Sequence, residues 1–414
     1  MFKGLLRMLP ALFDCMKKKV FRFFMKKIKL LGPLLRRPSR TLSSYLSLAF
    51  LPFAKFVHNT TPNRIGHLLF ETDTLLRDPG YQHTISRYTI LFLAFPEHIA
   101  NKAFLEIIHP YVKVIYLPSF LYGFIATHSR VTIPSVDYAV CIEKRSPAFA
   151  IQSNSLDRPL FELPMQWRER LSNYLLNKTG IKNAVYVCLH VREGGYSPWD
   201  EHLHFFRNAT INNYLKTVEY LASHNIFTIR MGDHSMTPAP KHSHLIDYAT
   251  SRDKSDILDL AIASQCFFWI GSSSGAMLLA AIFRRFICCT NMCLPLMFTA
   301  TGAPNQIGIP KLFLSRQTNL PVSFREIYAS GASEFRIPER FETTPYYLLE
   351  NTPDDIFDIA REAHLRLTGC WVEPDDYAKL HRMLQNLVPE HSLVYGSSQN
   401  CGYAFMKKNL ALFL

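Results

Sequence analysis

Between residues 184 and 289, short apolar runs alternate with segments that have the length and spacing of amphipathic helices, and this alternation constrains the fold more than any other feature. The predicted elements are strands at 184–191, 226–231, 266–270 and 285–289, and helices at 211–223, 255–264 and 274–284. Strands separated by helices of this length predict parallel βαβ units. Such a sheet binds ligands outside the carboxyl ends of its strands, so functional side chains are expected there.

Three polar segments stand at those strand ends. The candidate ligand-binding residues in them are His190 and Arg192, then Arg230 and Asp233, and finally Gly271, Ser272, Ser273, Ser274 and Gly275. A guanidinium and a serine-rich helix start both offer several donors to one anion, which predicts a grip on a diphosphate. His190 is expected to donate to a phosphate or sugar oxygen, and Asp233 to accept from a sugar hydroxyl.

Each of these residues also has a structural alternative. Arg192 could form a salt bridge with Glu193, a serine at 273 or 274 could simply cap the following helix, and Asp233 could cap its own loop.

An earlier α/β layer is expected from about residue 60 to 160, where further apolar runs at 89–95, 112–116 and 138–142 are separated in part by a helical pattern at 99–108. The segment 64–71 is interpreted as a strand or a strand-to-helix transition. His67, Glu71 and Asp73 there are candidate catalytic residues, because a histidine or carboxylate facing a ligand cleft can serve as general base toward a hydroxyl. A structural role for His67 remains the alternative.

The positive charge is concentrated in the first 40 residues. They contain twelve basic residues and one acidic residue, a net charge of +11, whereas the remaining 374 residues carry only +2. The apolar residues between these charges predict an amphipathic anchor on an anionic membrane surface, with packing on the protein's own body as the alternative. A nearly neutral body argues against nucleic acid as a partner. No signal-peptide pattern is apparent, so we expect the body to lie in the cytoplasm, on the inner face of the cell membrane.

Nine cysteines without framework spacing predict reduced thiols. Cys288, Cys289 and Cys293 are interpreted as core residues, and no metal is expected. The dinucleotide G-x-G-x-x-G and the P-loop are both missing from the sequence, so no cofactor is predicted either.

The segments Leu189–Arg192, Ile229–Asp233 and Ile270–Gly275 together resemble the three-motif layout of fucosyltransferase-like glycosyltransferases of the GT-B class. With Arg64–Leu68, Phe206–Tyr214 and Ile229–Met236, residues 60–370 more closely resemble a bacterial family of glycosyltransferases. The resemblance implies that Arg192, Ser272, Ser273 and Ser274 hold the donor's diphosphate without a metal. In fucosyltransferase-like enzymes the His-x-Arg motif continues with a second arginine and an aspartate. This chain has Glu193, Gly194 and Gly195 there, and the difference weighs against fucose and a GDP donor.

The predicted fold is therefore α/β and GT-B-like, with two Rossmann-like domains facing across a cleft. The expected divisions are a basic tail at 1–58, an acceptor domain at 59–180, a nucleotide-sugar domain at 181–350 and bracing helices at 351–414. The predicted function is metal-independent transfer of a hexosyl or deoxyhexosyl group from a nucleoside-diphosphate sugar to a glycan or lipid-linked acceptor, in bacterial surface polysaccharide or glycoconjugate synthesis. A non-catalytic, membrane-associated nucleotide-binding scaffold is the alternative.

Overall fold

The computed structural model describes residues 54–58, 62–80, 89–94, 99–116, 132–134, 158–196, 198, 201–293, 306–332, 338–391, 395 and 400–413. The basic tail at 1–40 and the strand predicted at 138–142 lie outside them. Contacts within the chain divide it into two units, residues 1–139 and 140–414. The boundary predicted at 180 lies within the second of these units, where the helix Met165–Thr179 packs against the helix Asp256–Gln265. The first strand, Ala54–His58, falls inside the segment assigned to the tail.

The first unit contains a parallel four-stranded sheet with the order β3-β2-β1-β4. Its elements are β1 (Ala54–His58), α4 (Ile65–Arg77), β2 (Thr89–Ala94), α6 (Lys102–Ile108), β3 (Lys113–Tyr116) and β4 (Thr132–Pro134). Residues 65–71 are therefore helical throughout, rather than the start of a strand. The apolar residues Leu68, Leu69 and Leu75 give α4 a buried face.

The second unit contains a seven-stranded sheet with the order β13-β10-β9-β8-β5-β6-β7, in which every pairing is parallel. The strands are β5 (Tyr186–His190), β6 (Phe227–Arg230), β7 (Leu245–Asp247), β8 (Phe268–Ser272), β9 (Phe286–Met292), β10 (Gln306–Pro310) and β13 (Asn400–Cys401). The central strands are buried along their whole length, as expected for a sheet covered on both faces. Cys288 and Cys289 lie buried on β9, which confirms their interpretation as core residues.

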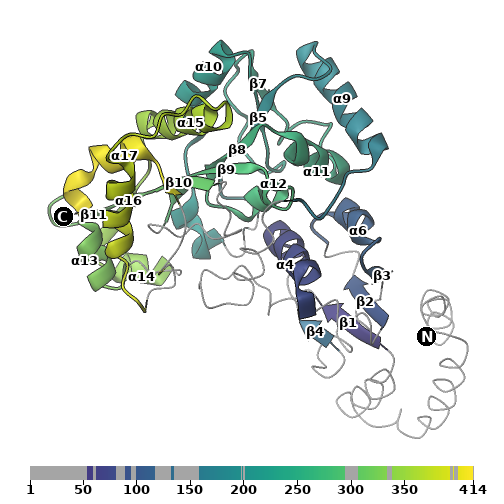
Figure 1. Ribbon diagram of the computed structural model, residues 1–414, viewed down its shortest axis with the longest axis horizontal. Helices are drawn as coiled ribbons and strands as arrows, with labels where there is room; N and C mark the ends of the chain where they lie inside the picture. The colour runs from purple at the N-terminus through teal and green to yellow at the C-terminus, as the bar shows by residue number, and fades with distance from the viewer. Residues whose placement is uncertain are drawn as a thin grey trace, which may run out of the picture. The chain divides into compact units, whose positions relative to one another are not determined.

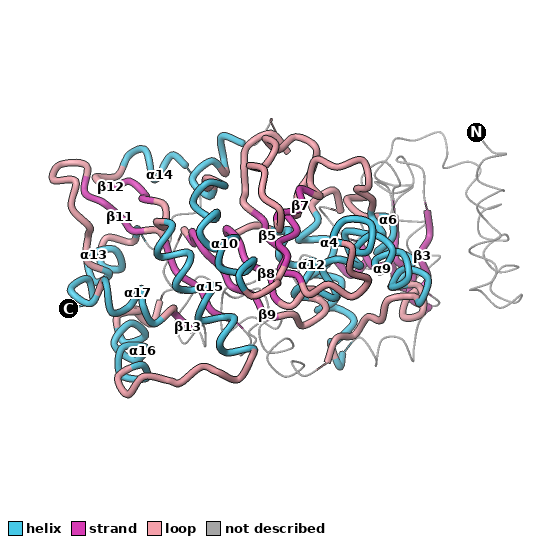
Figure 2. Tube along the Cα trace, turned by 90° about the horizontal axis from the view of Figure 1, so that it is seen from above, coloured by secondary structure: helices cyan, strands magenta, loops and turns pink. Residues whose placement is uncertain are grey.

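Helices cover both faces of this sheet (Figures 1 and 2). The helices α10 (Leu215–Ser223) and α15 (Pro353–Leu367) pack together on one face. The helices α9 (Met165–Thr179), α11 (Asp256–Gln265) and the short α12 (Leu278–Ala281) pack on the other. Two parallel sheets built from βαβ units confirm the predicted α/β fold class.

Local sequence signals explain where several helices begin and end. Ser255 caps α11, and Thr352 caps α15 in a reciprocal capping box with Asp355. Gly180 ends α9 with φ 75°, a conformation that glycine adopts without strain. The predicted helix at 274–284 is shorter than expected, because a 3₁₀ turn at Gly275–Met277 precedes α12 and the chain turns back at Arg284 with φ 57°.

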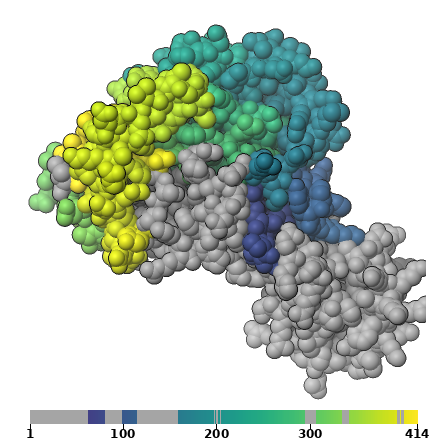
Figure 3. All heavy atoms as spheres, viewed as in Figure 1, coloured from purple at the N-terminus to yellow at the C-terminus, as the bar shows by residue number. Residues whose placement is uncertain are grey.

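The C-terminal segment completes the second unit. It contains α13 (Phe324–Ala329), α14 (Pro338–Thr343), α16 (Tyr377–Asn386), α17 (Tyr403–Lys408) and the antiparallel pair β11 (Leu312–Ser315) and β12 (Tyr346–Leu349). In the space-filling view the yellow helices α15 to α17 form a continuous mass on this unit (Figure 3). Across the described residues, no helix combines the length and apolar character needed to cross a bilayer.

Candidate functional site

The order of strands in the second unit places a topological switch point between β5 and β8. The chain runs outward from β5 to β6 and β7, then returns to the other side of β5 to form β8. The helices that follow β5 and β7 therefore lie on opposite faces, and in open α/β sheets a ligand crevice forms at such a point, outside the carboxyl ends of the strands. His190 ends β5, and Gly271 and Ser272 end β8. The predicted segments are thus brought to the edge at which such sheets bind ligands.

The two strand ends approach each other closely. His190 pairs with Gly271 across the ladder, and the amide of Arg192 donates to Ser272 Oγ at 2.7 Å. A Cβ atom on residue 271 would lie 1.9 Å from the carbonyl oxygen of His190, so only glycine fits. The close approach at Gly271 is therefore to the protein's own backbone.

The ring nitrogen of His190 that has no described partner is an acceptor rather than a donor. Its Nδ1 lies 3.1 Å from the carbonyl oxygen of Met231, which only accepts, so the proton is on Nδ1. Burial lowers the pKa of His190 to about 4, and the imidazole is neutral near pH 7. Its Nε2 atom is buried and has no partner among the described residues. The expectation that His190 donates to a phosphate is corrected: it can accept from a hydroxyl or water.

Arg192 is held by a loop that sequence reasoning did not assign. Its Nη2 donates to Glu201 Oε2 at 2.9 Å, and its Nη1 contacts Asn208 Oδ1 and the carbonyl of His204. Burial alone would raise the pKa of Glu201, but the hydrogen bonds from Arg192 and Asn208 outweigh burial and lower it. The salt bridge anticipated with Glu193 therefore forms with Glu201 instead.

A buried lysine binds the backbone of the loop 201–208, which contacts Arg192. Lys311 Nζ donates to the carbonyl of Asn208 at 2.7 Å and to that of Phe206 at 3.2 Å, and only 4% of Lys311 is exposed. Burial lowers the pKa of Lys311.

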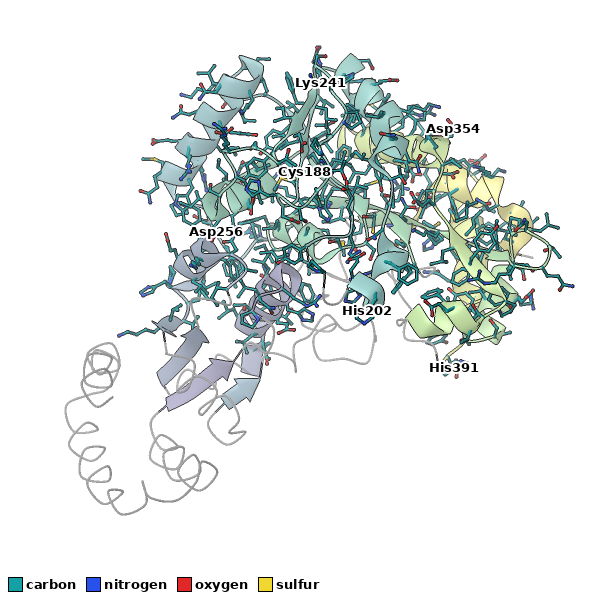
Figure 4. The ribbon with its side chains drawn as sticks, turned by 180° about the vertical axis from the view of Figure 1, so that it is seen from behind. Cys188, His202, Lys241, Asp256, Asp354 and His391 are labelled. Atoms are coloured by element: carbon teal, nitrogen blue, oxygen red, sulfur yellow. The ribbon has the colours of Figure 1, made fainter. Side chains whose placement is uncertain are left out.

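Figure 4 shows Cys188, two residues before the end of β5, in the interior of the unit, and His202 of the loop 201–208 toward its edge. The segment around Asn208 was visible in sequence only as part of the family resemblance.

Arg230 is fully buried and binds the segments that follow β5 and β6. Its Nη2 donates to Glu193 Oε1 at 2.5 Å, and its Nη1 donates to the carbonyl of Thr237 at 2.6 Å and to Asp247 Oδ1 at 3.3 Å. Two carboxylates thus already compensate this guanidinium. In this conformation Arg230 positions the loops that follow β5 and β6, and does not face a ligand.

The remaining predicted residues divide between local structure and the crevice. Asp233 accepts from the amide of Ser235 at 2.8 Å, so it caps its own loop, the second of the two roles considered. Ser274 is the N-cap of the 3₁₀ turn and accepts from the amide of Ala276 at 3.4 Å. Ser273 is 8% exposed and lies between the strand end and this cap. Together with His190 it supplies hydroxyl and imidazole groups at the switch point.

The three catalytic candidates lie on helix α4 of the first unit, which follows the carboxyl end of β1. His67 Nδ1 lies 2.6 Å from Glu71 Oε1, and the side chain of His67 is 43% exposed whereas that of Glu71 is fully buried. A buried carboxylate on Nδ1 orients the ring so that Nε2 can act as a base, an arrangement common in general-base catalysis. Asp73 is different: it is buried and bound through both oxygens to Arg77 Nε at 3.0 Å.

Within the described parts of the chain, no group of three or more histidine, cysteine or carboxylate side chains is arranged to bind a metal ion. The chemistry that the described groups offer is hydrogen bonding and proton transfer: a neutral acceptor imidazole, hydroxyls and an engaged arginine in one unit, and a histidine–glutamate pair in the other.

Comparison with known proteins finds no matching family model and no matching curated protein. Among solved structures, the chain is similar to ADP-heptose LPS heptosyltransferase II of E. coli, with 11% identity and a TM-score of 0.42 over 62% of this chain and 90% of that one. It is also similar to a family 9 glycosyl transferase of Veillonella parvula, with 11% identity and a TM-score of 0.49 over 76% and 98%. A third is the iron-containing dodecameric glycosyltransferase TibC of enterotoxigenic E. coli, with 12% identity and a TM-score of 0.32 over 61% and 63%. All three are glycosyltransferases.

Proposed function

We propose that this protein is a glycosyltransferase that moves a sugar from a nucleoside-diphosphate donor to a hydroxyl of a glycan or lipid-linked acceptor. The observation that carries the proposal is the meeting of the His190–Arg192 and Gly271–Gly275 segments at the switch point between β5 and β8. The resemblance of these segments to glycosyltransferase motifs points to a nucleotide sugar, and to bacterial surface polysaccharide or glycoconjugate synthesis.

In the proposed reaction, Ser273, Ser274 and Arg192 bind the diphosphate. Arg192 would exchange Glu201 for phosphate oxygens, which accept the same bidentate geometry. A cation beside the diphosphate lowers the barrier because negative charge develops there as the sugar departs. His190 Nε2, as a neutral acceptor, would take a hydrogen bond from a hydroxyl of the donor.

The base in this proposal is His67. Its Nε2 would remove the proton of the acceptor hydroxyl as the new glycosidic bond forms, while Glu71 holds Nδ1. Asp73 would fix the helix through Arg77 instead of contacting substrate. Of the three candidates, this proposal makes His67 the base, Glu71 its positioning residue and Asp73 a structural residue.

One observation favours the alternative of a non-catalytic nucleotide-binding scaffold. Both arginines expected to bind the donor, Arg192 and Arg230, are already neutralised by carboxylates. A scaffold would bind a nucleotide through the serines and His190 and would turn over no sugar. The two functions therefore differ in whether Arg192 is needed and whether the base is needed.

The test uses the full chain, its Arg192→Ala variant, and Arg252→Ala as a control that removes an exposed arginine of the same unit. Thermal unfolding is measured with a panel of nucleoside diphosphates and their sugars, since a ligand at 100 times its Kd adds about 2.7 kcal/mol of stability. We expect one diphosphate to stabilise the wild type and the control but not Arg192→Ala. Sugar transfer from that donor should fall about 100-fold or more in Arg192→Ala.

The base is tested separately with His67→Gln. Donor binding should survive this change while transfer is lost, and Glu71→Gln should lower transfer by weakening the orientation of His67. Donor binding with no transfer by the wild type to any acceptor would favour the scaffold. Near-normal transfer by Arg192→Ala would refute its assignment to the diphosphate.

We also propose that residues 1–40 hold the enzyme at an anionic membrane surface on the cytoplasmic side. The charge of +11 in this segment carries the proposal. Because β1 begins at Ala54, a deletion should stop at residue 40 and leave the first sheet intact. Loss of flotation with anionic vesicles after this deletion is the expected result, and unchanged flotation would contradict it.

A further inference from the structure

A pocket of about 380 Å³ lies within the second unit at the amino-terminal edge of its sheet, the edge opposite the candidate site. Helix α9 forms one wall, and the segments that lead into β5, β8 and β9 form the others. All lining residues fall between 168 and 285. The volume is within the range of pockets that take small-molecule ligands. None of the groups assigned above to donor or acceptor lines it.

Helix α9 presents a mixed face to this pocket. Arg168, Leu171, Ser172 and Leu175 follow the i, i+3, i+4, i+7 spacing that places side chains on one side of a helix. Leu171 and Leu175 are each 4% exposed and form part of the floor. Arg168 and Ser172 add a cation and a hydroxyl above them. The helix therefore offers an apolar base with polar groups at the opening.

Arg285 supplies a second cation from the opposite wall. Its Nε donates at 2.5 Å to the carbonyl of Ser264, one of the last carbonyls of α11, which have no partner within their own helix. This bond holds the guanidinium in place and leaves its two NH₂ groups for other acceptors. Among the described residues that line the pocket there is no carboxylate, so the charges of Arg168 and Arg285 are not compensated there.

We propose that this pocket is a second ligand site, which binds a phosphate monoester with a small apolar or aromatic part. Two arginines facing one space match a phosphate monoester, which carries nearly two negative charges near pH 7, better than a singly charged carboxylate. Ser172 and Asn183 add neutral hydrogen-bonding groups, and Leu171, Leu175 and Phe267 accommodate the apolar part. The site is independent of the proposed transfer reaction.

The experiment measures binding of phenyl phosphate to the full chain by calorimetry, with inorganic phosphate, phenol and benzoate as partial probes. Phenyl phosphate should bind more tightly than each of the three. Hydrogen–deuterium exchange should show protection in peptides that cover residues 165–186 and 262–287. Protection in these peptides separates the pocket from the candidate site at the opposite edge.

Arg168→Ala should raise the Kd for phenyl phosphate by about tenfold, the loss of one charge-assisted hydrogen bond. Arg170→Ala is the matched control, because it removes an exposed arginine of the same helix that does not line the pocket. Arg285→Lys keeps the charge but loses the two-pronged donor, and should also weaken binding.

The proposal is overturned by any of three results: phenyl phosphate does not bind, it binds equally well to wild type, Arg168→Ala and Arg285→Lys, or it protects only the carboxyl edge of the sheet. Benzoate that binds as tightly as phenyl phosphate would contradict the requirement for a dianion. Sugar transfer by Arg168→Ala is measured in parallel, and a failure of the transfer reaction leaves this binding test unaffected.

Discussion

The buried imidazole of His190 should make the second unit lose stability in mild acid. His190 is 5% exposed, its Nδ1–H donates to the carbonyl of Met231, and no described acceptor lies near Nε2 to receive a hydrogen bond if that nitrogen were protonated. Protonation in the folded state therefore creates a buried charge without compensation, and burial lowers the pKa from 6.5 to about 4. In the unfolded chain the same ring protonates near pH 6.5.

The direction of the change in unfolding free energy with pH follows from the difference between these two pKa values. Between pH 6.5 and 4 the unfolded chain binds more protons at this residue than the folded chain, so the free energy of unfolding falls as pH falls. The contribution of His190 is complete above pH 6.5 and is lost toward pH 4. The two pKa values differ by an amount that corresponds to about 3 kcal/mol in total, of which about 2 kcal/mol should be lost between pH 7.5 and pH 5.

The variant that isolates this effect is His190→Asn, which does not titrate but places an amide donor near Met231 O. Urea unfolding is followed by tryptophan fluorescence at both pH values. All four tryptophans, at 167, 199, 269 and 371, belong to the second unit, so the signal reports on that unit. The wild type should lose about 2 kcal/mol more than His190→Asn between pH 7.5 and pH 5.

His202→Asn is the matched control, because it replaces an exposed histidine in the loop that follows the same strand. Its pH dependence should equal that of the wild type. If His190→Asn also loses stability as steeply as the wild type, the buried imidazole does not have the depressed pKa, and its assignment as a neutral acceptor at the crevice fails.

Three further changes test how the site is built, each by urea unfolding. Gly271→Ala should destabilise the second unit by about 1–3 kcal/mol or more, because a Cβ atom would lie 1.9 Å from the backbone oxygen of His190; wild-type stability would refute the close approach. Lys311→Met should cost about 1–3 kcal/mol by removing the ammonium donor from the carbonyls of Phe206 and Asn208, whereas the exposed Lys241→Met control should change little; equal effects would show that Lys311 does not anchor this loop. Thr352→Ala should cost about 1 kcal/mol through loss of the capping box of α15. Unchanged stability would show that this capping box does not stabilise the helix.

Much of the second sheet was predictable from local pattern. The central strands are continuous apolar runs, and the helices that cover the sheet carry their own start or stop signals, such as Ser255, Thr352 and Gly180. Two predictions failed where local pattern was ambiguous. The apolar run after Arg64 forms helix α4, and the helix after Ser274 is broken into a 3₁₀ turn and a single short α segment.

The candidate site was likewise predictable only in part. The sequence indicated which residues stand at strand ends, because strand ends are marked by where an apolar run stops. It did not show that Glu201 and Asn208 come back over Arg192, that Lys311 anchors that loop from more than a hundred residues away, or that Arg230 is buried between Glu193 and Asp247. These partners were unassigned because ion pairs join residues that only the folded chain brings together.

The sequence alone determined the class of fold and the edge of the sheet that holds the site, since periodicity and capping depend on neighbours a few residues apart. The tertiary structure decided the roles of individual side chains. His190 is an acceptor at Nε2 because its N–H on Nδ1 donates to the carbonyl of Met231, just after β6, and Gly271 is required because the backbone of β5 occupies the space of a side chain. Protonation, burial and close approach depend on what surrounds an atom in space.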